Sequence, residues 1–246
     1  LNGRRFPQVL IDEATQATEP ASLVALTRGA RQVVLVGDHK QLPPTVISFR
    51  AEEKGLKRSL FERLVDLGIE PLLLSTQYRM HPAISKFPNQ HFYSDRLDDG
   101  VKSENRLAPA GLLWPDWDNP VAFIPVDGGE VVSPDGTSRE NPTEVSWVIK
   151  ILNDILEAGE ITKKDIGIIT PYAGQVRAIR NSMSEKLDDV EVKTVDGYQG
   201  REKEVIIFSC VRSNAEQNIG FLSEMRRLNV ALTRAKRGLI VIGDPA

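Results

Sequence analysis

The sequence predicts an α/β fold in which helices cover parallel sheets. Short aliphatic runs recur along the 246 residues, and several are continuously apolar, as in parallel strands that are buried on both faces. Segments with helical periodicity lie between them, and such alternation of strand and helix is typical of parallel sheets. The runs cover residues 8–11, 33–38, 71–75, 121–126, 166–170, 190–195, 205–211 and 238–244.

The segment from Asn141 to Gly159 is the clearest predicted helix. Its apolar residues recur at helical spacing, Asn141 can cap the first turn, and Pro142 suits the first helical position. Glu144 completes an arrangement that resembles a capping box, and Gly159 offers the stop. In contrast, residues 98–136 are rich in Gly, Pro and Asp and are predicted to form loops around one strand.

The composition is that of a globular protein, with 41% hydrophobic and 26% charged residues. The net charge of −3 neither indicates nor excludes a nucleic-acid partner, because binding depends on where Lys and Arg cluster. Cys210 is the single cysteine, and the sequence has no secretory signal and no long apolar run, so we expect an intracellular, soluble protein without a membrane partner. Leu1 is not an initiator methionine, so we expect a piece of a longer chain.

Two apolar runs end in polar residues that suit magnesium and phosphate chemistry. Asp12 and Glu13 follow the run 8–11, so a strand would deliver both carboxylates to its C-terminal end, where open α/β sheets bind ligands. There, Asp12 would hold the hydration shell of Mg²⁺, and Glu13 would orient or deprotonate the water that attacks a γ-phosphate. Gln41 follows the run 33–38, and its neutral amide can hydrogen-bond a phosphate oxygen or that water. A helix cap or loop start explains the carboxylates as well, and a polar turn explains Gln41.

The stretch STQYRMHP places Tyr78 beside Arg79. The planar guanidinium of Arg79 suits a phosphate, and the ring of Tyr78 can stack on a base, although such a pair also occurs on ordinary surfaces. His81 precedes Pro82 at a predicted helix start, which favours a structural hydrogen bond over catalysis.

The last quarter of the chain carries a glycine-flanked loop and a basic segment. Gly197 and Gly200 permit close approach of the backbone to a ligand, and Gln199 and Glu202 add polar groups; a tight turn with solvated charge is the alternative. Arg234 lies near the end of an apolar stretch, where it would point into an interdomain cleft and neutralise charge on a phosphate. The neighbouring basic residues favour a solvated or nucleic-acid-facing surface; they are Arg226, Arg227, Lys236 and Arg237.

In this order, the motifs resemble those of the superfamily 1 RNA and DNA helicases of the up-frameshift type, which act in nonsense-mediated mRNA decay. The resemblance rests on GDHKQLPP, QYRMHP, VDGYQGREKEVIIFSCVR and RRLNVALTRAKRGLIVIGD, and it is weakest between residues 98 and 140. It implies two RecA-like domains of the P-loop NTPase fold with ATP between them. Residues 1–70 would be the C-terminal part of the first domain, with Walker B and motif III, and residues 71–246 a nearly complete second domain, with motifs IV to VI.

The resemblance also implies cofactors and roles for the residues of the first domain. ATP and Mg²⁺ are the implied cofactors. Asp12 and Glu13 match the magnesium-binding and water-activating carboxylates, and Gln41 matches the γ-phosphate sensor.

In the second domain, the resemblance implies that Tyr78 stacks on adenine. Arg79 and Arg234 match the two phosphate-directed arginines, and Glu202 resembles the residue that contacts the ribose. Gly200, in the same loop as Glu202, is expected to bind the nucleotide as well.

The sequence contains no G-x-x-x-x-G-K-[ST] pattern. It therefore encodes neither the nest of amides around a β-phosphate nor the lysine that reaches the γ-phosphate. The family carries this loop upstream of the carboxylate strand. We therefore expect the C-terminal portion of a helicase core that is inactive alone.

The intact protein is expected to be an ATP-dependent helicase or translocase in mRNA decay, mainly in the cytoplasm, with the nucleus left open. Its partners would be single-stranded nucleic acid, with RNA favoured, and regulatory proteins. The protein would contact the nucleic acid largely through its phosphates and stacked bases. Two alternatives remain, a natural truncated pseudoenzyme and a nucleotide-regulated scaffold. Either would bind nucleic acid or protein partners without ATP turnover.

Overall fold

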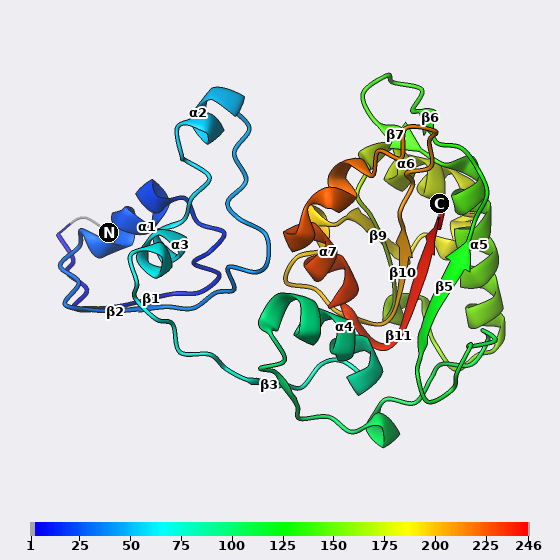
Figure 1. Ribbon diagram of the computed structural model, residues 1–246, viewed down its shortest axis with the longest axis horizontal. Coiled ribbons are helices and arrows are strands. Elements are labelled where there is room, and N and C mark those ends of the chain that lie inside the picture. The colour runs from blue at the N-terminus through cyan, green and yellow to red at the C-terminus, as the bar shows by residue number, and fades with distance from the viewer. Residues whose placement is uncertain (1–2, 246) are drawn as a thin grey trace. The chain divides into compact units, whose positions relative to one another are not determined.

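The computed structural model describes residues 3–245. The chain divides into two compact units, Leu1–Leu73 and Leu74–Ala246, whose helices and strands are labelled in Figure 1. No helix within residues 3–245 has both the length and the apolar character that crossing a bilayer requires.

The first unit contains a two-stranded parallel sheet. Its register pairs Gln8 with Gln32 and Ile11 with Leu35, so both strands end at the same edge. The two strands are joined by a crossover helix, and Thr18 and Ser59 form an isolated bridge that ties the later part of the unit to the start of that helix. The elements are β1 (Gln8–Ile11), α1 (Glu19–Leu26), β2 (Gln32–Leu35), α2 (Phe49–Glu53) and α3 (Leu60–Asp66).

The strands of the first unit are not buried on both faces. Leu10 of β1 is 67% exposed, and Val34 of β2 is exposed as well. Burial on both faces requires helices on each face and further strands on each side, whereas within residues 3–73 this sheet has two strands and one crossover helix. The predicted two-sided burial is therefore wrong for β1 and β2.

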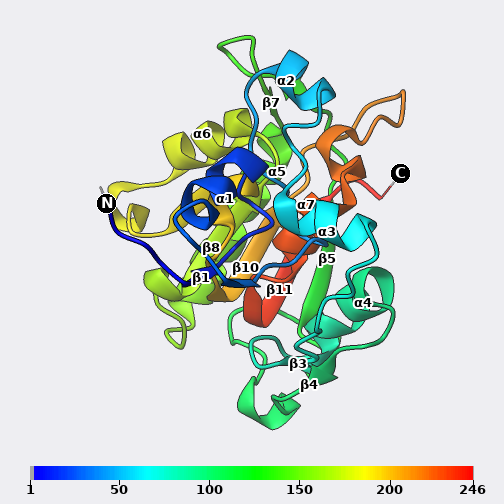
Figure 2. The same ribbon diagram turned by 90° about the vertical axis from the view of Figure 1, so that its left-hand side faces the viewer.

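The second unit is built on five parallel strands in the order β5-β11-β10-β8-β9. Figure 2 shows β8, β10, β11 and β5 side by side in this order. Every residue of β8 is buried, and so are five of the seven residues of β10, which confirms the prediction of apolar, buried strands. The strands are β5 (Val121–Pro125), β8 (Ile166–Thr170), β9 (Glu191–Thr194), β10 (Lys203–Ser209) and β11 (Ala235–Gly243).

Helices cover both faces of this sheet. Helices α5 and α6 lie on one face, and α4 and α7 lie on the other (Figure 1). The largest apolar core forms between α5, α6 and the strands, and Val148, Leu152, Ile155 and Ile179 are completely buried in it. The helices are α4 (Pro82–Tyr93), α5 (Pro142–Glu157), α6 (Ala173–Ser182) and α7 (Met225–Leu232), and the short 3-10 turns are η1 (Ser103–Asn105), η2 (Lys163–Asp165), η3 (Glu185–Leu187), η4 (Asp196–Tyr198) and η5 (Gly220–Ser223).

Short strands complete the second unit, and one predicted strand is missing. Residues 71–75 form no strand: Ser75 accepts the Asp98 N–H at 2.7 Å, but the paired strand begins only at Thr76, and Leu72 is 98% exposed. Residues 98–136 contain β5 as expected, together with two-residue strands. These short strands are β3 (Thr76–Gln77), which pairs with β4 (Asp98–Asp99), and β6 (Val131–Val132), which pairs with β7 (Arg139–Glu140).

The predicted helix α5 begins and ends where the sequence indicated, but its first turn differs. The side chain of Asn141 accepts a hydrogen bond from the Glu144 backbone N–H at 3.1 Å, and Gly159 follows the helix with a φ of 76°. The capping box is wrong, because the Asn141 N–H donates to Gln175 instead of to Glu144. The Glu144 carboxylate accepts the Ser209 hydroxyl at 2.6 Å and the Val211 N–H at 2.9 Å.

Candidate nucleotide-binding site

Asp12 and Glu13 lie in an exposed turn directly after β1. Asp12 Oδ1 accepts the Glu13 N–H at 2.9 Å, and Glu13 Oε2 accepts a hydrogen bond from Gln16 Nε2 at 2.7 Å. Glu13 has a φ of 50°, a left-handed conformation that non-glycine residues rarely adopt. Strain of this kind concentrates at functional sites, where the surrounding structure holds it in place.

The two carboxylates fit Mg²⁺ as a partial ligand set. Mg²⁺ prefers oxygen ligands, keeps several waters, and is usually bound by one or two carboxylates together with substrate phosphates. One oxygen of Asp12 and one of Glu13 are used in the turn, and the other oxygen of each remains. No group of three or more His, Cys, Asp or Glu side chains that could hold a metal ion forms within residues 3–245.

Gln41 follows β2 at the same edge of the sheet. Its Nε2 donates to Asp38 Oδ2 at 2.8 Å, and Asp38 Oδ1 accepts the Lys40 N–H at 2.9 Å, so Asp38 fixes the turn that carries Gln41. The two loops after β1 and β2 pack closely, because a Cβ on Gly37 would lie 3.0 Å from the Thr15 nitrogen. The parallel register thus brings the loop with the carboxylates and the loop with Gln41 together.

Tyr78 and Arg79 lie in a tight loop between β3 and α4. The side chain of Tyr78 is 69% exposed. Gln77 holds the loop, since its Oε1 accepts the N–H groups of Arg79 at 3.0 Å and of Met80 at 2.8 Å. At the end of the loop, buried His81 caps α4 through Nδ1, which accepts the Ala83 N–H at 3.0 Å, and burial lowers the pKa of His81. The structural role expected for His81 is confirmed.

Arg79 and Glu202 form an ion pair in the second unit. Arg79 Nε donates to Glu202 Oε2 at 2.6 Å, and Lys236 Nζ lies 3.0 Å from Glu202 Oε1. Partial burial raises the pKa of Glu202, but the hydrogen bonds from Arg79 and Lys236 outweigh it and hold that pKa below its ordinary value. Arg79 Nη1 also donates to the Thr233 carbonyl at 3.0 Å, one residue before Arg234.

Arg234 is buried inside the second unit, with 2% of its surface exposed. Its Nε donates to the Val230 carbonyl at 3.0 Å, and its Nη2 donates to Thr233 Oγ1 at 2.8 Å. The side chain therefore lies along the end of α7 rather than extended into solvent. Tyr78 and Arg79 are neighbours in the sequence, whereas Glu202 and Arg234 come from two distant segments. The Thr233 carbonyl joins Arg79 to the end of α7.

The basic residues near α7 are paired within the second unit. Arg227 bonds to Glu224 and lies 3.3 Å from Asp196, and its guanidinium stacks on the Phe221 ring. Arg237 pairs with Glu160 in the same way. These arginines are therefore largely neutralised by neighbouring carboxylates.

The loop between β9 and β10 is held by a residue that sequence reasoning missed. Tyr198 is fully buried, and a Cβ on Gly167 of β8 would overlap with its hydroxyl, so the close contact requires a glycine there. Gly200 has a φ of 74° with open space around it, so the backbone conformation explains this glycine. Gly197 shows only ordinary contacts in the described structure.

The comparisons with known proteins agree with the motif order. A family model described as an AAA domain matches residues 56–246, and a second AAA-domain model matches residues 1–49. The chain is 49% identical to the "Regulator of nonsense transcripts 1 homolog" of Neurospora crassa, over 100% of this chain and 23% of that protein. It is 47% identical to the "ATP-dependent helicase NAM7" of Saccharomyces cerevisiae, over 98% of this chain and 26% of that protein. The chain thus spans about a quarter of the length of the curated relatives it matches.

A solved structure of PRRSV helicase aligns with a TM-score of 0.48 and 19% sequence identity. The alignment covers 96% of this chain and 34% of that chain.

Proposed function

Because the chain belongs to the AAA-domain family of up-frameshift-type superfamily 1 helicases, we propose that it is part of an ATP-dependent helicase that moves along single-stranded RNA. Its relatives are named as regulators of nonsense transcripts and as ATP-dependent helicases. The proposal assigns the chemistry of ATP hydrolysis to the first unit and the recognition of the nucleotide to both units.

One observation carries the proposal for the second unit. Arg79 bonds to both Glu202 and the Thr233 carbonyl, next to Arg234, although these residues lie more than 120 positions from Arg79 in the sequence. Two arginines, a carboxylate and the exposed ring of Tyr78 together suit a nucleoside triphosphate. The ring would stack on the base, Glu202 would accept a ribose hydroxyl, and the guanidinium groups would neutralise phosphate charge.

In the first unit, Glu13 would accept the proton that the attacking water loses. Asp12 would hold Mg²⁺, which supplies charge neutralisation on the phosphates when it is bound. The Gln41 amide would orient the same water or a γ-phosphate oxygen, and Asp38 keeps Gln41 in place at 2.8 Å. In the second unit, Gly200 would let the backbone follow the nucleotide, since its φ of 74° is easily reached only by glycine.

Arg234 would have to leave its present bonds before it could reach a phosphate. Its bonds to Val230 and Thr233 occupy Nε and Nη2. We therefore include a rearrangement at the end of α7 in the proposal. Such conformational steps accompany closure of many nucleotide-hydrolysing enzymes.

The proposal extends to nonsense-mediated mRNA decay in the cytoplasm, with RNA as the nucleic acid and regulatory proteins as further partners. The names of the relatives support this assignment. Contacts to phosphates and stacked bases would make the grip dependent on salt and tolerant of sequence.

ATP hydrolysis with and without a single-stranded RNA tests the proposal. The 246-residue chain has no phosphate-loop motif, so we expect little hydrolysis from it. A form extended upstream by roughly 200 residues, the size of one domain, should hydrolyse ATP faster when RNA is present. Glu13→Gln should lower kcat by about 10²–10⁴, the usual contribution of a general base, and Arg234→Ala should lower it by at least about 10³.

Glu53→Gln and Arg50→Ala serve as matched controls. Both residues are exposed on α2, and neither belongs to the proposed site. They should retain the activity of the unmodified protein. Absence of RNA-stimulated hydrolysis in the extended form would refute the proposal and favour a pseudoenzyme or a scaffold.

A further inference from the structure

The exposed ring of Tyr78 lies against a glycine. A Cβ added to Gly100 would overlap with Cδ1 and Cε1 of the Tyr78 ring and with the Thr76 side chain. The backbone of Gly100 has no left-handed φ, so a turn does not explain the glycine. The Gly100 N–H donates to the Gln77 carbonyl at 2.8 Å, which fixes the glycine beside the ring. The ring therefore lies against Gly100 through Cδ1 and Cε1, and the Tyr78 side chain is still 69% exposed.

The backbone of the Tyr78–Arg79 pair is held by two polar side chains. Gln77 accepts two N–H groups of the loop through Oε1, and its Nε2 donates to the Met80 carbonyl at 2.9 Å and to Asp99 at 2.6 Å. Arg106 donates from Nε to the Arg79 carbonyl at 3.1 Å and from Nη2 to the Tyr78 carbonyl at 3.4 Å. Tyr78, Arg79 and Met80 thus each have a backbone group that is fixed by the side chain of Gln77 or Arg106.

We propose that Gly100, Gln77 and Arg106 are positioning residues that present Tyr78 to a nucleobase and Arg79 to the attached phosphates. Gly100 provides the space that the Cδ1–Cε1 part of the ring occupies, and the exposed remainder of the ring is offered to a planar base. Arg106 and Gln77 fix the backbone from which both side chains extend, and the bonds to Glu202 and Thr233 hold the guanidinium. This inference rests on the proposed function. It adds the residues that position Tyr78 for stacking on a nucleobase.

Fluorine NMR on the 246-residue chain tests the position of the ring directly. The chain contains four tyrosines, so labelling with 3-fluorotyrosine gives few resonances, and Tyr78→Phe assigns the relevant one. Gly100→Ala should shift the Tyr78 resonance, because the exposed ring can move into solvent at little cost to folding. The resonances of buried Tyr172 and Tyr198 should stay in place.

Gly129→Ala is the matched control for this substitution. Gly129 also lacks a left-handed φ, and a Cβ there would meet nothing within 4 Å. It should leave the Tyr78 resonance unchanged. If Gly100→Ala also leaves that resonance unchanged, the positioning role is overturned, whatever the hydrolysis assay shows.

A second experiment uses the ATP-hydrolysing extended form. Gly100→Ala should raise KM for ATP about 5–20-fold with a smaller change in kcat, since stacking on an aromatic ring contributes to binding of a base. Inhibition by ADP should weaken similarly, whereas inhibition by inorganic pyrophosphate, which has no base, should stay the same. Equal weakening for ADP and pyrophosphate would reveal a purely structural defect and overturn the proposal.

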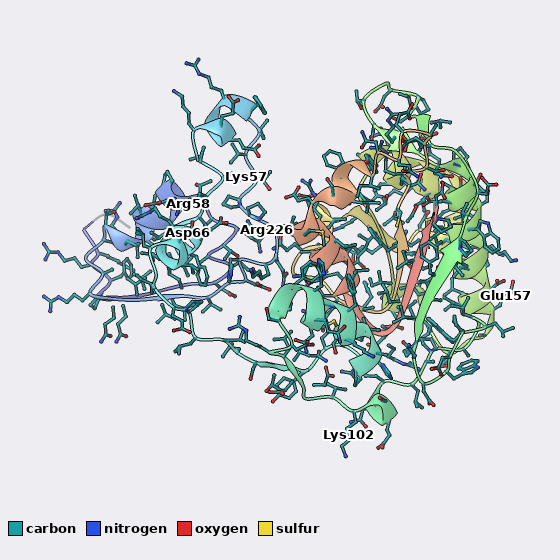
Figure 3. All side chains as sticks on the ribbon, in the orientation of Figure 1. Lys57, Arg58, Asp66, Lys102, Glu157 and Arg226 are labelled. Carbon is teal, nitrogen blue, oxygen red and sulfur yellow. The ribbon has the colours of Figure 1, made fainter. Side chains whose placement is uncertain are left out.

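Arg106 can be tested in the same assay. Arg106→Ala should raise KM for ATP, and Arg106→Lys should restore part of the loss, because a lysine can donate to one of the two carbonyls. The control is Lys102→Ala at the start of the same turn, where the side chain points away from the protein (Figure 3). If no form hydrolyses ATP, the proposed function fails together with the nucleotide part of this inference, and the NMR result then reports on the geometry alone.

Discussion

Glu144 is a fully buried carboxyl group under the first turn of α5. Burial raises its pKa to about 7, although hydrogen bonds from Ser209 and from the Val211 backbone lower it. The Val211 N–H that it accepts belongs to a β-branched residue with a φ of 74°. Glu144 therefore bonds to a strained backbone position just after the end of β10.

The raised pKa predicts how stability depends on pH. The folded state holds the proton of Glu144 more tightly than the unfolded state, so this group contributes stability that is complete below about pH 4.5 and is lost as the pH rises to about 7. The loss is on the order of 3 kcal/mol at full effect. Glu144→Gln should remove this part of the pH dependence, measured as the difference in urea unfolding between pH 5 and pH 8.

Glu157→Gln is the control for Glu144→Gln. Glu157 is exposed at the end of the same helix, where its side chain points into solvent (Figure 3). This variant should keep the pH dependence of the unmodified chain. An identical pH dependence in Glu144→Gln and the unmodified chain would show that Glu144 titrates normally.

Tyr198 carries a buried hydroxyl group without a hydrogen-bond partner among the described residues. A buried polar atom without a partner costs about 1–3 kcal/mol. Tyr198→Phe should therefore raise the free energy of unfolding by about 1 kcal/mol in chemical denaturation. Tyr93→Phe should do the opposite, because the Tyr93 hydroxyl accepts a hydrogen bond from Asn229 at 2.9 Å. A clear loss of stability in Tyr198→Phe would mean that its hydroxyl has a partner in solution.

Helix α5 begins at a buried capping residue that makes several hydrogen bonds. Asn141 is buried, accepts the Glu144 N–H through Oδ1, and donates through Nδ2 to the Gly128 carbonyl at 2.5 Å. Asn141→Ala should lower the free energy of unfolding by about 2–3 kcal/mol, from the lost cap and from a buried carbonyl without its donor. Ser48→Ala at the exposed cap of α2, with a bond of 3.3 Å, should cost only about 0.5 kcal/mol in the same denaturation experiment. Equal costs at the two caps would contradict this reading of α5.

The sequence predicts those helices and strands whose own residue pattern is sufficient to identify them. The run 166–170 is apolar at nearly every position and forms the inner strand β8, and α5 shows a complete helical pattern with both ends marked. The runs 8–11 and 71–75 are equally apolar, but their burial and pairing depend on neighbouring segments, which no local pattern reveals. For the same reason, the partners of Glu144 could not be predicted, since Ser209 and Val211 lie some 65 residues further on.

The candidate site divides in the same way. The sequence indicated Asp12, Glu13 and Arg79 as candidate site residues, because the charge of a carboxylate or a guanidinium is known from the residue type alone. Burial of Arg234 and support of the tyrosine-arginine loop by Arg106 depend on tertiary contacts. A motif therefore names reacting groups more readily than it names the residues that hold them.

Between the two units, the chain crosses an exposed irregular segment. Residues 70–75 form no helix or strand, and Leu72 and Leu74 are almost fully exposed. Proteases cleave at such sites in preference to paired backbone. We expect limited thermolysin digestion to cut first before Leu72 or Leu74 and to release a fragment that begins there, as identified by mass spectrometry. Leu72→Asp with Leu74→Asp should delay this cut, and a first cut within 121–243 would contradict the division into units.

The strand order of the second unit also constrains how the molecule is made. Strand β11, the last in the chain, pairs with β5 on one side and β10 on the other. While a ribosome synthesises the chain from its N-terminus, β5 is finished more than 100 residues before β11, and it has no neighbour in this sheet until β11 arrives. The nascent unit must therefore keep an apolar, unpaired strand for most of its synthesis, which is the kind of surface that molecular chaperones recognise.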